Sequence, residues 1–438
     1  MDEPDTVFAL STAPGRAGIA VIRLSGPGAA AALMALAGTV PPPRHAQRIR
    51  VRDPAGGEAI DEGLALYFPA PRSVTGEDVA ELHVHGSRAV VAAVLACLGR
   101  LGLRPAEPGE FTRRAFLNGK LDLSAVEGLA DLVAAETAAQ RRQALRQLDG
   151  ALGRLAERWR ARLLSAQARL EAAIDFPDED LPAGLWDAAR GEAAALVAEI
   201  AAHLGDDHRG ERLREGVMVA VLGPPNAGKS SLVNALARRD VAITAAASGT
   251  TRDVIEVALD LGGYPVTLAD TAGLRDAVDP VEAEGVRRTR ARAAAADLKL
   301  VLYDATRPEE LDALAGLIDA NALVIANKSD LLPAGAAPPA GLALSVATGP
   351  GMAALLARLG AEVARRLDAG AAPLVTRARH RAALDECCTA LRRFDGAPLP
   401  ELAAEELRAA ARALGRITGR LDVEDMLDRV FAEFCIGK

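Results

Sequence analysis

A glycine-rich octapeptide constrains this chain more than any other feature. The segment GPPNAGKS, residues 223–230, directly follows the apolar run VMVAVL and directly precedes the helical sequence SLVNALARR. In a P-loop, placed in the same way between strand and helix, glycines let backbone N–H groups turn toward phosphate oxygens. We expect Lys229 to bring positive charge to the β and γ phosphates and the Ser230 hydroxyl to bind Mg²⁺. The sequence therefore predicts a nucleotide-binding α/β domain around this loop.

Two further motifs follow in the order found in GTPases. GTTRD carries Thr251, which is placed to close over Mg²⁺ and the γ phosphate. The strand-like VTLADTAGL ends in Asp270, a water-mediated Mg²⁺ ligand, and continues to Gly273, whose N–H can reach the γ phosphate.

The segment NKSD, ending at Asp330, predicts the choice of base. Its carboxylate can accept hydrogen bonds from the N1–H and the 2-amino group of guanine, which adenine cannot supply. Such a site rejects an analogue lacking these donors by roughly 10⁴-fold or more. The segment SVA, Ser345 to Ala347, follows the last strand and is expected to close on the base.

The residue that positions the attacking water is not evident from the motifs. Ras-like GTPases place a glutamine directly after DTAG, but here the residue is Leu274, which cannot hydrogen-bond a nucleophile. The acidic residues downstream are candidates, and composition alone does not choose among them: Asp276, Asp279, Glu282 and Glu284.

Composition and periodicity predict a multidomain chain. We expect an α+β N-terminal domain over 1–118, a helical domain in two parts over 119–215 and 373–438, and a Ras-like α/β G domain inserted over 216–372. No leader pattern or run of about 18 apolar residues appears, so a cytoplasmic protein without a membrane span is expected.

Charge and cysteine content narrow the function classes. The net charge of −8 gives no global attraction for nucleic acid, so any RNA contact must come from a local patch. The four cysteines show no CxxC pair, which argues against a disulfide framework or a structural zinc. Three of them are expected to be buried small hydrophobes or surface thiols: Cys97, Cys387 and Cys388.

Taken from end to end, the chain resembles the MnmE (TrmE) family of bacterial tRNA modification GTPases. The resemblance is carried by TVFALSTAPGRAGIAVIRLSG, TGEDVAELHVHG, PGEFTRRAFLNGKLDL, IDFPDED, the GTPase motifs and the terminal FCIGK. The nucleotide-binding residues that the motifs and the resemblance together imply are Asn226, Ala227, Gly228, Lys229, Ser230, Ser231, Ala245, Thr250, Thr251, Asp270, Thr271, Ala272, Gly273, Asn327, Lys328, Asp330, Ser345, Val346 and Ala347.

The resemblance implies activation by K⁺-dependent dimerisation rather than by an arginine finger. A K⁺ ion would be held by Asn226 and by the loop that contains Ala245, Ala247 and Thr250. Glu282 matches the family's catalytic glutamate, which acts through water. The segment AAAS, residues 245–248, is richer in alanine than is usual in the family, but carbonyl ligands would not depend on these side chains.

The resemblance also implies a folate site and partners. Arg23, Glu81, Lys120 and Lys438 fall on positions that contact a 5-formyltetrahydrofolate-type donor, and Cys435 is a thiol proposed to act in the modification chemistry. The family works as a homodimer with the FAD-dependent MnmG to modify C5 of the wobble uridine (position 34) of certain tRNAs to an aminomethyl or carboxymethylaminomethyl group. Two alternatives remain open: a ribosome-assembly GTPase, and a GTP-gated scaffold that performs no covalent chemistry itself.

Overall fold

The protein is described here from a computed structural model. The structure describes residues 5–175, 184–239, 241–243, 256–270, 296–368, 372, 374–420, 430, 431, 434 and 437. The chain divides into two compact units. Unit 1 comprises Met1–Ala130, Gln147–Glu179 and Ala404–Lys438, and unit 2 comprises Asp131–Arg146 and Asp180–Ala403. The predicted domain boundaries are a finer division than these two units, and they stay a prediction.

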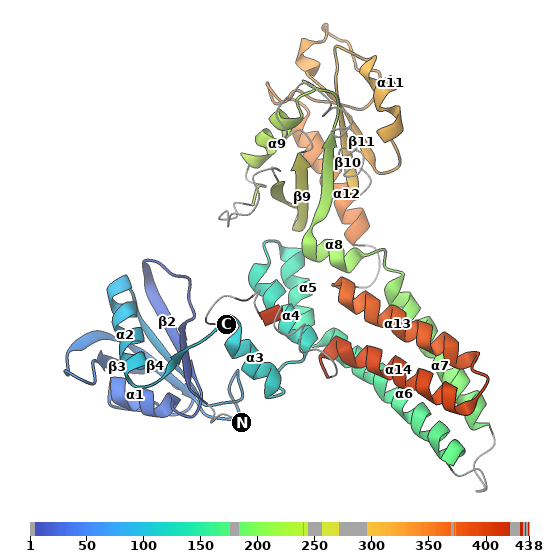
Figure 1. The fold of residues 1–438 in the computed structure, drawn as a ribbon. Helices are drawn as coiled ribbons and strands as arrows, with labels where there is room; N and C mark the ends of the chain where they lie inside the picture. Colours follow the sequence, from blue (N-terminus) through green and yellow to red (C-terminus); the bar gives the residue numbers. More distant parts are fainter. Residues whose placement is uncertain are drawn as a thin grey trace, which may run out of the picture. The chain divides into compact units, whose positions relative to one another are not determined.

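Unit 1 begins with a six-stranded sheet in the order β3-β4-β5-β2-β1-β6 (Figure 1). All neighbouring strands are antiparallel except β1 and β6, which are parallel. The strands are β1 Val7–Leu10, β2 Ala17–Ser25, β3 Gln47–Arg52, β4 Ala59–Phe68, β5 Val79–Gly86 and β6 Arg104–Pro105. Strand and helix alternation here confirms the α+β class predicted for the N-terminal part.

The helices α1 (Ala29–Ala37) and α2 (Arg88–Arg100) complete the core of this sheet. Ile22 and Leu24 of β2 and Leu82 of β5 are fully buried in that core. Because successive strand residues point to opposite faces, Arg23 and Glu81 lie on the other face of the sheet.

Further helices of unit 1 follow the sheet. They are α3 (Glu110–Leu117), the first part of α4 (Leu123–Ala134), the end of α5 (Ala138–Leu148), α6 (Ala151–Asp175) and most of α14 (Pro400–Thr418). The helices α5 and α6, within the range 119–215 predicted to be helical, are separated at Gly150, whose φ of 75° suits a helix C-terminus. A salt bridge of 3.0 Å between Arg408 and Glu171 joins α14 to α6.

The last described residues of unit 1 pack against α4 and β1. Phe431 and Phe434 form an apolar cluster with Leu123 and Val126 of α4. At Gly437 the φ is +99°, and a Cβ there would lie 2.3 Å from the carbonyl oxygen of Leu10. Since Leu10 belongs to β1, Gly437 packs closely against the N-terminal sheet, at a position that requires glycine.

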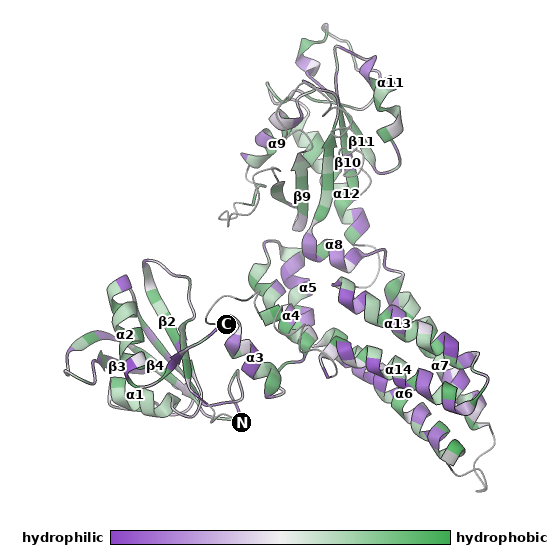
Figure 2. Cartoon of the chain, in the orientation of Figure 1, coloured by the Kyte–Doolittle hydropathy of each residue, from purple (hydrophilic) through white to green (hydrophobic). Residues whose placement is uncertain are grey.

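Unit 2 contains a second six-stranded sheet in the order β12-β11-β10-β7-β9-β8 (Figure 1). Its strands are β7 Val217–Leu222, β8 Glu256–Leu261, β9 Tyr264–Asp270, β10 Leu298–Asp304, β11 Ala322–Asn327 and β12 Leu342–Ala343. Only the β8–β9 pair is antiparallel. Figure 2 shows hydrophobic colour along β9, β10 and β11, as expected for parallel strands covered on both faces. This sheet confirms the α/β class predicted for the nucleotide-binding region.

Helices of unit 2 flank that sheet or belong to the helical part of the chain. Those within the α/β region are α9 (Lys229–Ala237), α11 (Glu310–Leu314) and α12 (Met352–Leu367). The start of α5, α7 (Leu185–Leu204), α8 (Arg209–Glu215) and α13 (Ala378–Asp395) make up the helical part. The rings of Trp186 and Phe394 stack at 6.4 Å between centroids, which joins α7 to α13.

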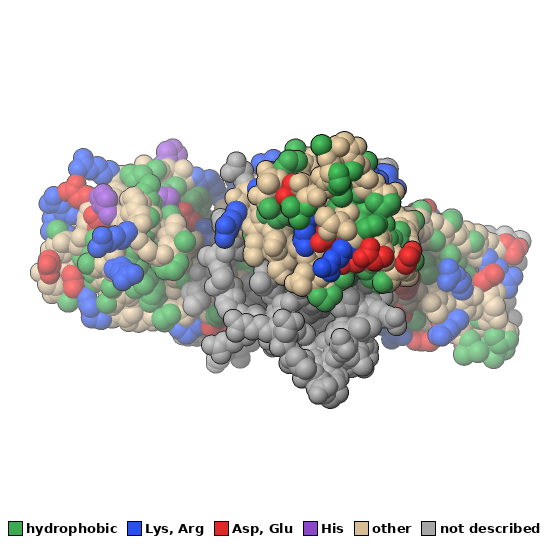
Figure 3. Space-filling model, turned by 90° about the horizontal axis from the view of Figure 1, so that it is seen from above, with side chains coloured by type: hydrophobic (Ala, Val, Ile, Leu, Met, Phe, Trp, Pro, Cys, Tyr) green, Lys and Arg blue, Asp and Glu red, His purple; other side chains and the backbone are tan. Residues whose placement is uncertain are grey.

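Two global properties of the described residues bear on function. None of the helices within them is long and apolar enough to span a bilayer. On the face shown in Figure 3, the basic side chains of the described residues are interspersed with acidic and apolar ones. Any RNA contact on this face would therefore depend on a local group of cations, as the net charge already indicates.

Candidate functional site

The P-loop lies between β7 and α9, as predicted, and its glycines are required by close contacts. Gly223 has φ +151°, and a Cβ there would lie 2.2 Å from the carbonyl oxygen of Leu302. Gly228 has φ +96°, and its Cβ would lie 2.2 Å from Nδ2 of Asn327. Any larger residue would displace the loop from β10 or from the NKSD segment. The positive φ values at these glycines shape the loop into a turn that leads directly into α9.

Charge and hydrogen-bond donors converge at the centre of this loop. Lys229 Nζ donates to the carbonyl oxygens of Gly223 at 2.9 Å and Pro224 at 2.8 Å, so its ammonium lies over the loop. Asn226 adopts a left-handed conformation with φ 62° and is exposed at the rim of the loop. The N-terminus of α9, with Ser230 and Ser231 exposed in its first turn, adds backbone N–H groups and the positive end of the helix dipole. These features suit a polyphosphate.

Asn327, the first residue of NKSD, joins two loops of the site. Its side-chain Nδ2 donates to the carbonyl of Ala227 at 2.8 Å, and its Oδ1 accepts from the backbone N–H of Val346 at 3.2 Å. The residue is 3% exposed. Asn327 therefore holds the P-loop and the SVA segment in place, a role that the sequence did not distinguish from contact with the nucleotide.

Lys328 is fixed by a partner that sequence reasoning missed. It has φ 60°, and its Nζ lies 2.7 Å from Oδ2 of Asp304 at the end of β10. Burial alone raises the pKa of Asp304, but hydrogen bonds from Lys328 and Thr306 outweigh it and hold that pKa below its ordinary value. Asp304 thus stays ionised near neutral pH and anchors the NKSD turn.

The predicted base-recognition residues line one cavity of about 760 Å³ with the P-loop. Asp330 lies in the short helix η2 (Ser329–Leu331), is exposed, and makes no hydrogen bond or ion pair within the described part of the chain. Ser345 is buried, and its Oγ accepts from the N–H of Thr348 at 3.1 Å, which shapes the SVA loop. The cavity lining includes nine predicted residues: Asn226, Gly228, Ser231, Asn327, Lys328, Asp330, Ser345, Val346 and Ala347.

The cavity has a wall that sequence reasoning missed. Besides Ser231, the helix α9 contributes Asn234 and Ala235, its C-cap residue Arg238 follows them, and η2 contributes Leu331. The α9 positions fall at i, i+3, i+4 and i+7, which is one face of a helix. That spacing from Ser231 was the available signal, but which face of α9 is free depends on the packing of Leu232, Val233 and Leu236 into the core.

Part of the predicted site lies outside the described residues. Asp270 ends β9 and pairs with Val221 of β7, two residues before Gly223, and this places its backbone beside the P-loop. The following predicted residues lie outside the described ranges: Ala245, Ala247, Thr250, Thr251, Thr271, Ala272, Gly273, Leu274, Asp276, Asp279, Glu282, Glu284, Cys435 and Lys438.

The residue types near the P-loop fit Mg²⁺. Ser230 offers a hydroxyl at the N-terminus of α9, and the backbone of Asp270, the last residue of β9, pairs with Val221 of β7. Hydroxyl, carboxylate and phosphate oxygens are the ligands that Mg²⁺ prefers. No group of three His, Cys, Asp or Glu side chains within the described ranges could form a separate metal centre.

The predicted folate positions gather partly on the N-terminal sheet. Arg23 and Glu81 are direct cross-strand partners, with Arg23 Nη2 2.9 Å from Glu81 Oε1. The Arg23 guanidinium also lies 5.8 Å from the ring centroid of Phe111 in α3. Lys120 is exposed and follows α3, while Ser11 Oγ donates to the carbonyl of Gly437 at 3.0 Å. Arg23 and Glu81 are thus brought together, and Gly437 lies next to the end of the neighbouring strand β1.

The three described cysteines are not candidates for catalysis. Cys97, Cys387 and Cys388 are free and buried. Burial raises the pKa of each thiol above its ordinary value. Each therefore remains a protonated thiol near neutral pH, and the alternative of buried small hydrophobes is confirmed for them.

Comparison with known proteins decides the family. The family model described as GTP-binding protein TrmE N-terminus matches residues 6–120, and the MnmE helical domain model matches residues 123–435. The chain belongs to the MnmE family of tRNA modification GTPases. The Paramagnetospirillum magneticum protein named tRNA modification GTPase MnmE is 58% identical over 440 residues, which cover 99% of this chain and 100% of that relative.

A second curated relative and a solved structure are also similar to this chain. The Rhodospirillum rubrum protein of the same name is 56% identical over 452 residues, covering 99% of each chain. Among solved structures, the G domain of the T. maritima FeoB iron transporter is 24% identical and covers 34% of this chain and 98% of that chain, with a TM-score of 0.26. The relatives of this MnmE-family chain match it along its whole length, so the resemblance is not confined to the G domain.

Proposed function

We propose that this chain is a GTPase that acts in tRNA modification. One observation carries the proposal: the P-loop and the Asp330 turn border the same 760 Å³ cavity, tied together by the hydrogen bond from Asn327 to Ala227. A phosphate-binding loop held at a fixed distance from a free carboxylate is what guanine-nucleotide selection requires. Membership in a family whose relatives are named tRNA modification GTPases supports the tRNA substrate.

The residues of the chain divide the work of binding GTP. The Lys229 ammonium and the N-terminus of α9 stabilise negative charge on the phosphates, and the Asp330 carboxylate accepts from the guanine N1–H and 2-amino group. The Ala347 N–H, which makes no hydrogen bond among the described residues, is free to donate to the base. Ser230, Thr251 and Asp270 would hold Mg²⁺, which would supply charge neutralisation at the phosphates being cleaved.

We infer that hydrolysis also depends on K⁺ and on Glu282. The support for K⁺ is the exposed Asn226 at the P-loop rim and the family's use of Ala245, Ala247 and Thr250 in an ion-binding loop. Such an ion would place positive charge where other GTPases use an arginine finger. Because Leu274 cannot orient water, Glu282 is assigned this role through a second water. Dimerisation of two G domains accompanies K⁺ binding in this proposal.

The N-terminal domain is proposed to bind a one-carbon folate such as 5-formyltetrahydrofolate through Arg23, Glu81, Lys120 and Lys438. The Arg23–Glu81 pair supports this proposal because it offers a donor and an acceptor side by side on the sheet face away from the α1–α2 core. Its exposure of 25% for Arg23 and 17% for Glu81 leaves both reachable by a ligand.

The chemical modification that the enzyme makes is inferred from its family rather than from its fold. We propose that the homodimer works with FAD-dependent MnmG to place an aminomethyl or carboxymethylaminomethyl group on C5 of the wobble uridine of certain tRNAs. The match over residues 6–120 favours this reading over a ribosome-assembly GTPase, which would share only the G domain. The second candidate, a GTP-gated scaffold, differs in giving Cys435 no part in the chemistry.

Mass spectrometry of wobble uridine tests the function directly. A strain lacking the gene should lose the C5 modification, and the wild-type gene should restore it while Lys229→Ala should not. Equal levels of C5-modified wobble uridine in the deletion and parent strains would refute the role in tRNA modification. Full restoration by Cys435→Ser would favour the scaffold.

A further inference from the structure

The first turn of α5 contacts the tip of the β8–β9 hairpin. The backbone N–H of Ala139 donates to the carbonyl oxygen of Gly263 at 3.0 Å. Ala139 is 3% exposed and belongs to the core cluster of the second sheet, although it lies in a helix that continues into the helical part of the chain. A donor at the start of a helix has no partner within that helix, so this bond satisfies both groups.

The geometry of both partners is fixed locally. Thr137 and Gln140 form a capping box: the N–H of Gln140 donates to Thr137 Oγ1 at 3.3 Å, and the N–H of Thr137 donates to Gln140 Oε1 at 3.0 Å. On the hairpin, Gly262 and Gly263 have φ values of 67° and 90°, as a two-residue type I′ turn requires. The contact therefore joins two rigid turns.

The same segment also holds the chain that enters the second sheet. Gln140 Nε2 donates to the carbonyl of Arg214 at 3.0 Å, and Gln143 Nε2 donates to the carbonyl of Gly210 at 3.1 Å. Arg214 lies 3.2 Å from Asp131 Oδ1, the atom that also accepts from Arg377 Nη2 at 2.7 Å. Segment 131–146 thus binds α8, the segment after α12 and the hairpin together.

The hairpin leads from this contact to the nucleotide site. Strand β9 runs from Tyr264, next to the turn, to Asp270, and it pairs in parallel with β7 from Val217↔Val266 to Val221↔Asp270. A slip of β9 by two residues would keep its buried face but would move Asp270 about 6.6 Å along β7. A contact at the tip of the β8–β9 hairpin is therefore able to hold β9 in the register that pairs Asp270 with Val221, next to the P-loop.

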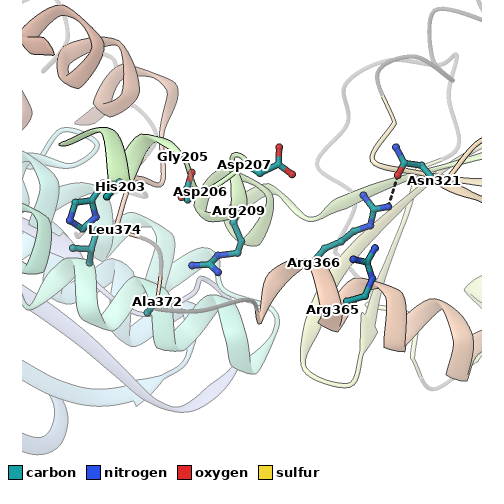
Figure 4. Close-up of a pocket in the computed structure, with 11 residues that line it drawn as sticks. His203, Gly205, Asp206, Asp207, Arg209, Asn321, Arg365, Arg366, Ala372 and Leu374 are labelled. Atoms are coloured by element: carbon teal, nitrogen blue, oxygen red, sulfur yellow. Dashed lines mark hydrogen bonds between the residues drawn. The ribbon is translucent and has the colours of Figure 1, made fainter. Parts of the chain in front are cut away.

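The α/β region is also connected to the helical part through α8, where Arg212 Nε lies 2.6 Å from Asp297 Oδ1. A cavity of about 670 Å³ lies between the α7–α8 turn and the C-terminal end of α12, and the one hydrogen bond drawn among its lining residues joins Arg366 to Asn321 at 2.7 Å (Figure 4). Both of those residues belong to the α/β region. The contact at α5 is thus accompanied by the α8 ion pair as a second connection to the α/β region.

We propose that the first turn of α5, Thr137 to Gln140, is a positioning element of the nucleotide site that acts through the β8–β9 hairpin. It holds β9 in the register that places Asp270 beside the P-loop, and it thereby couples Mg²⁺·nucleotide binding to segment 131–146. The inference rests on the proposed function, because it assumes that Asp270 serves a bound Mg²⁺·nucleotide.

Two proline variants of the full chain test the coupling. Ala139→Pro removes the N–H that donates a hydrogen bond to the Gly263 carbonyl. The position lies in the first helical turn, where proline is tolerated. Ala138→Pro, at the exposed preceding residue and the preferred helix position for proline, is the matched control. We expect Ala139→Pro to lower the affinity for a fluorescent non-hydrolysable GTP analogue about fivefold in Mg²⁺, which is the scale of one hydrogen bond. In EDTA the loss of affinity should be much smaller.

The outcomes separate this inference from a purely structural role and from failure of the proposed function. Equal losses with and without Mg²⁺, or no loss, would overturn the positioning role. A wild-type chain that binds no guanine nucleotide would instead refute the function.

Amide hydrogen exchange of the wild-type chain decides the case if Ala139→Pro fails to fold. Binding of the Mg²⁺·nucleotide should slow exchange at the Ala139 N–H, because linkage between the contact and the ligand is reciprocal. The Arg141 N–H, bonded within the helix to the carbonyl of Thr137 at 3.0 Å, is the internal control. Equal exchange at Ala139 with and without nucleotide would overturn the coupling.

Discussion

Replacing Asp330 by asparagine should change which purine the site prefers. The amide keeps one acceptor for the guanine N1–H but presents an N–H group to the 2-amino group, where two donors oppose each other. Xanthine carries a carbonyl at that position, so the same amide can donate to it. The substitution changes neither the size of the side chain nor the cavity that it lines.

The structure sets the size of the effect. Asp330 is exposed and makes no hydrogen bond within the described residues. The free energy of unfolding of the variant should therefore lie within about 0.5 kcal/mol of that of the wild type. In the complex one charge-assisted hydrogen bond is lost and a second is weakened, which together cost about 2.7 kcal/mol. We therefore expect the Kd for GTP to rise about 100-fold.

Competition against a fluorescent guanine nucleotide would measure both ligands. Asp330→Asn should bind GTP more weakly than the wild type does and xanthosine triphosphate more tightly. Asp312→Asn, which changes an exposed carboxylate of α11 outside the cavity lining, should bind both nucleotides as the wild type does. Equal GTP affinity in Asp330→Asn and wild type, from proteins of equal thermal stability, would remove Asp330 from base recognition.

Three further outcomes follow from the site. GTP hydrolysis should be faster in KCl than in NaCl at matched ionic strength, and Asn226→Ala should abolish the difference; equal rates in the two salts would contradict the ion mechanism. Glu282→Ala should lower single-turnover kcat by about 100-fold with nucleotide affinity nearly unchanged, whereas a larger loss in Asp276→Ala would show that the catalytic carboxylate had been misassigned. Arg238→Ala should lower the affinity for GDP about threefold to tenfold because it removes a cation from the cavity wall. Arg239 does not line the cavity, so Arg239→Ala should leave the affinity unchanged, and titration of both variants with GDP would decide this.

The sequence predicted the parts of the site that are written in local motifs. The P-loop lies between β7 and α9 because its glycines, its preceding apolar strand and its following helix are contiguous in the chain. NKSD and SVA likewise follow their strands, and the structure places them in one cavity with the loop.

What the sequence could not predict depends on contacts between distant segments. The hydrogen bond from Asn327 to Ala227 spans 100 residues, and it turns a motif residue into a brace between loops. The ion pair of Lys328 with Asp304 has the same character, since neither residue type reveals its partner. The TAAQ sequence of the α5 capping box could be recognised as a helix start, but its docking on Gly263 requires the tertiary fold.

The seating of Gly437 against Ser11 has a consequence for the order in which the protein is made. These two residues are 426 positions apart, and Phe431 and Phe434 cover an apolar face of α4 that is synthesised long before them. On the ribosome the strands β1–β6 can pair early, while Leu123 and Val126 must wait for aromatic partners that emerge near the end of translation. Because loop-closure entropy grows only with the logarithm of length, the delay affects timing far more than final stability. Nascent chains stalled before residue 430 should therefore expose this α4 surface to chaperones, and completed chains should hide it.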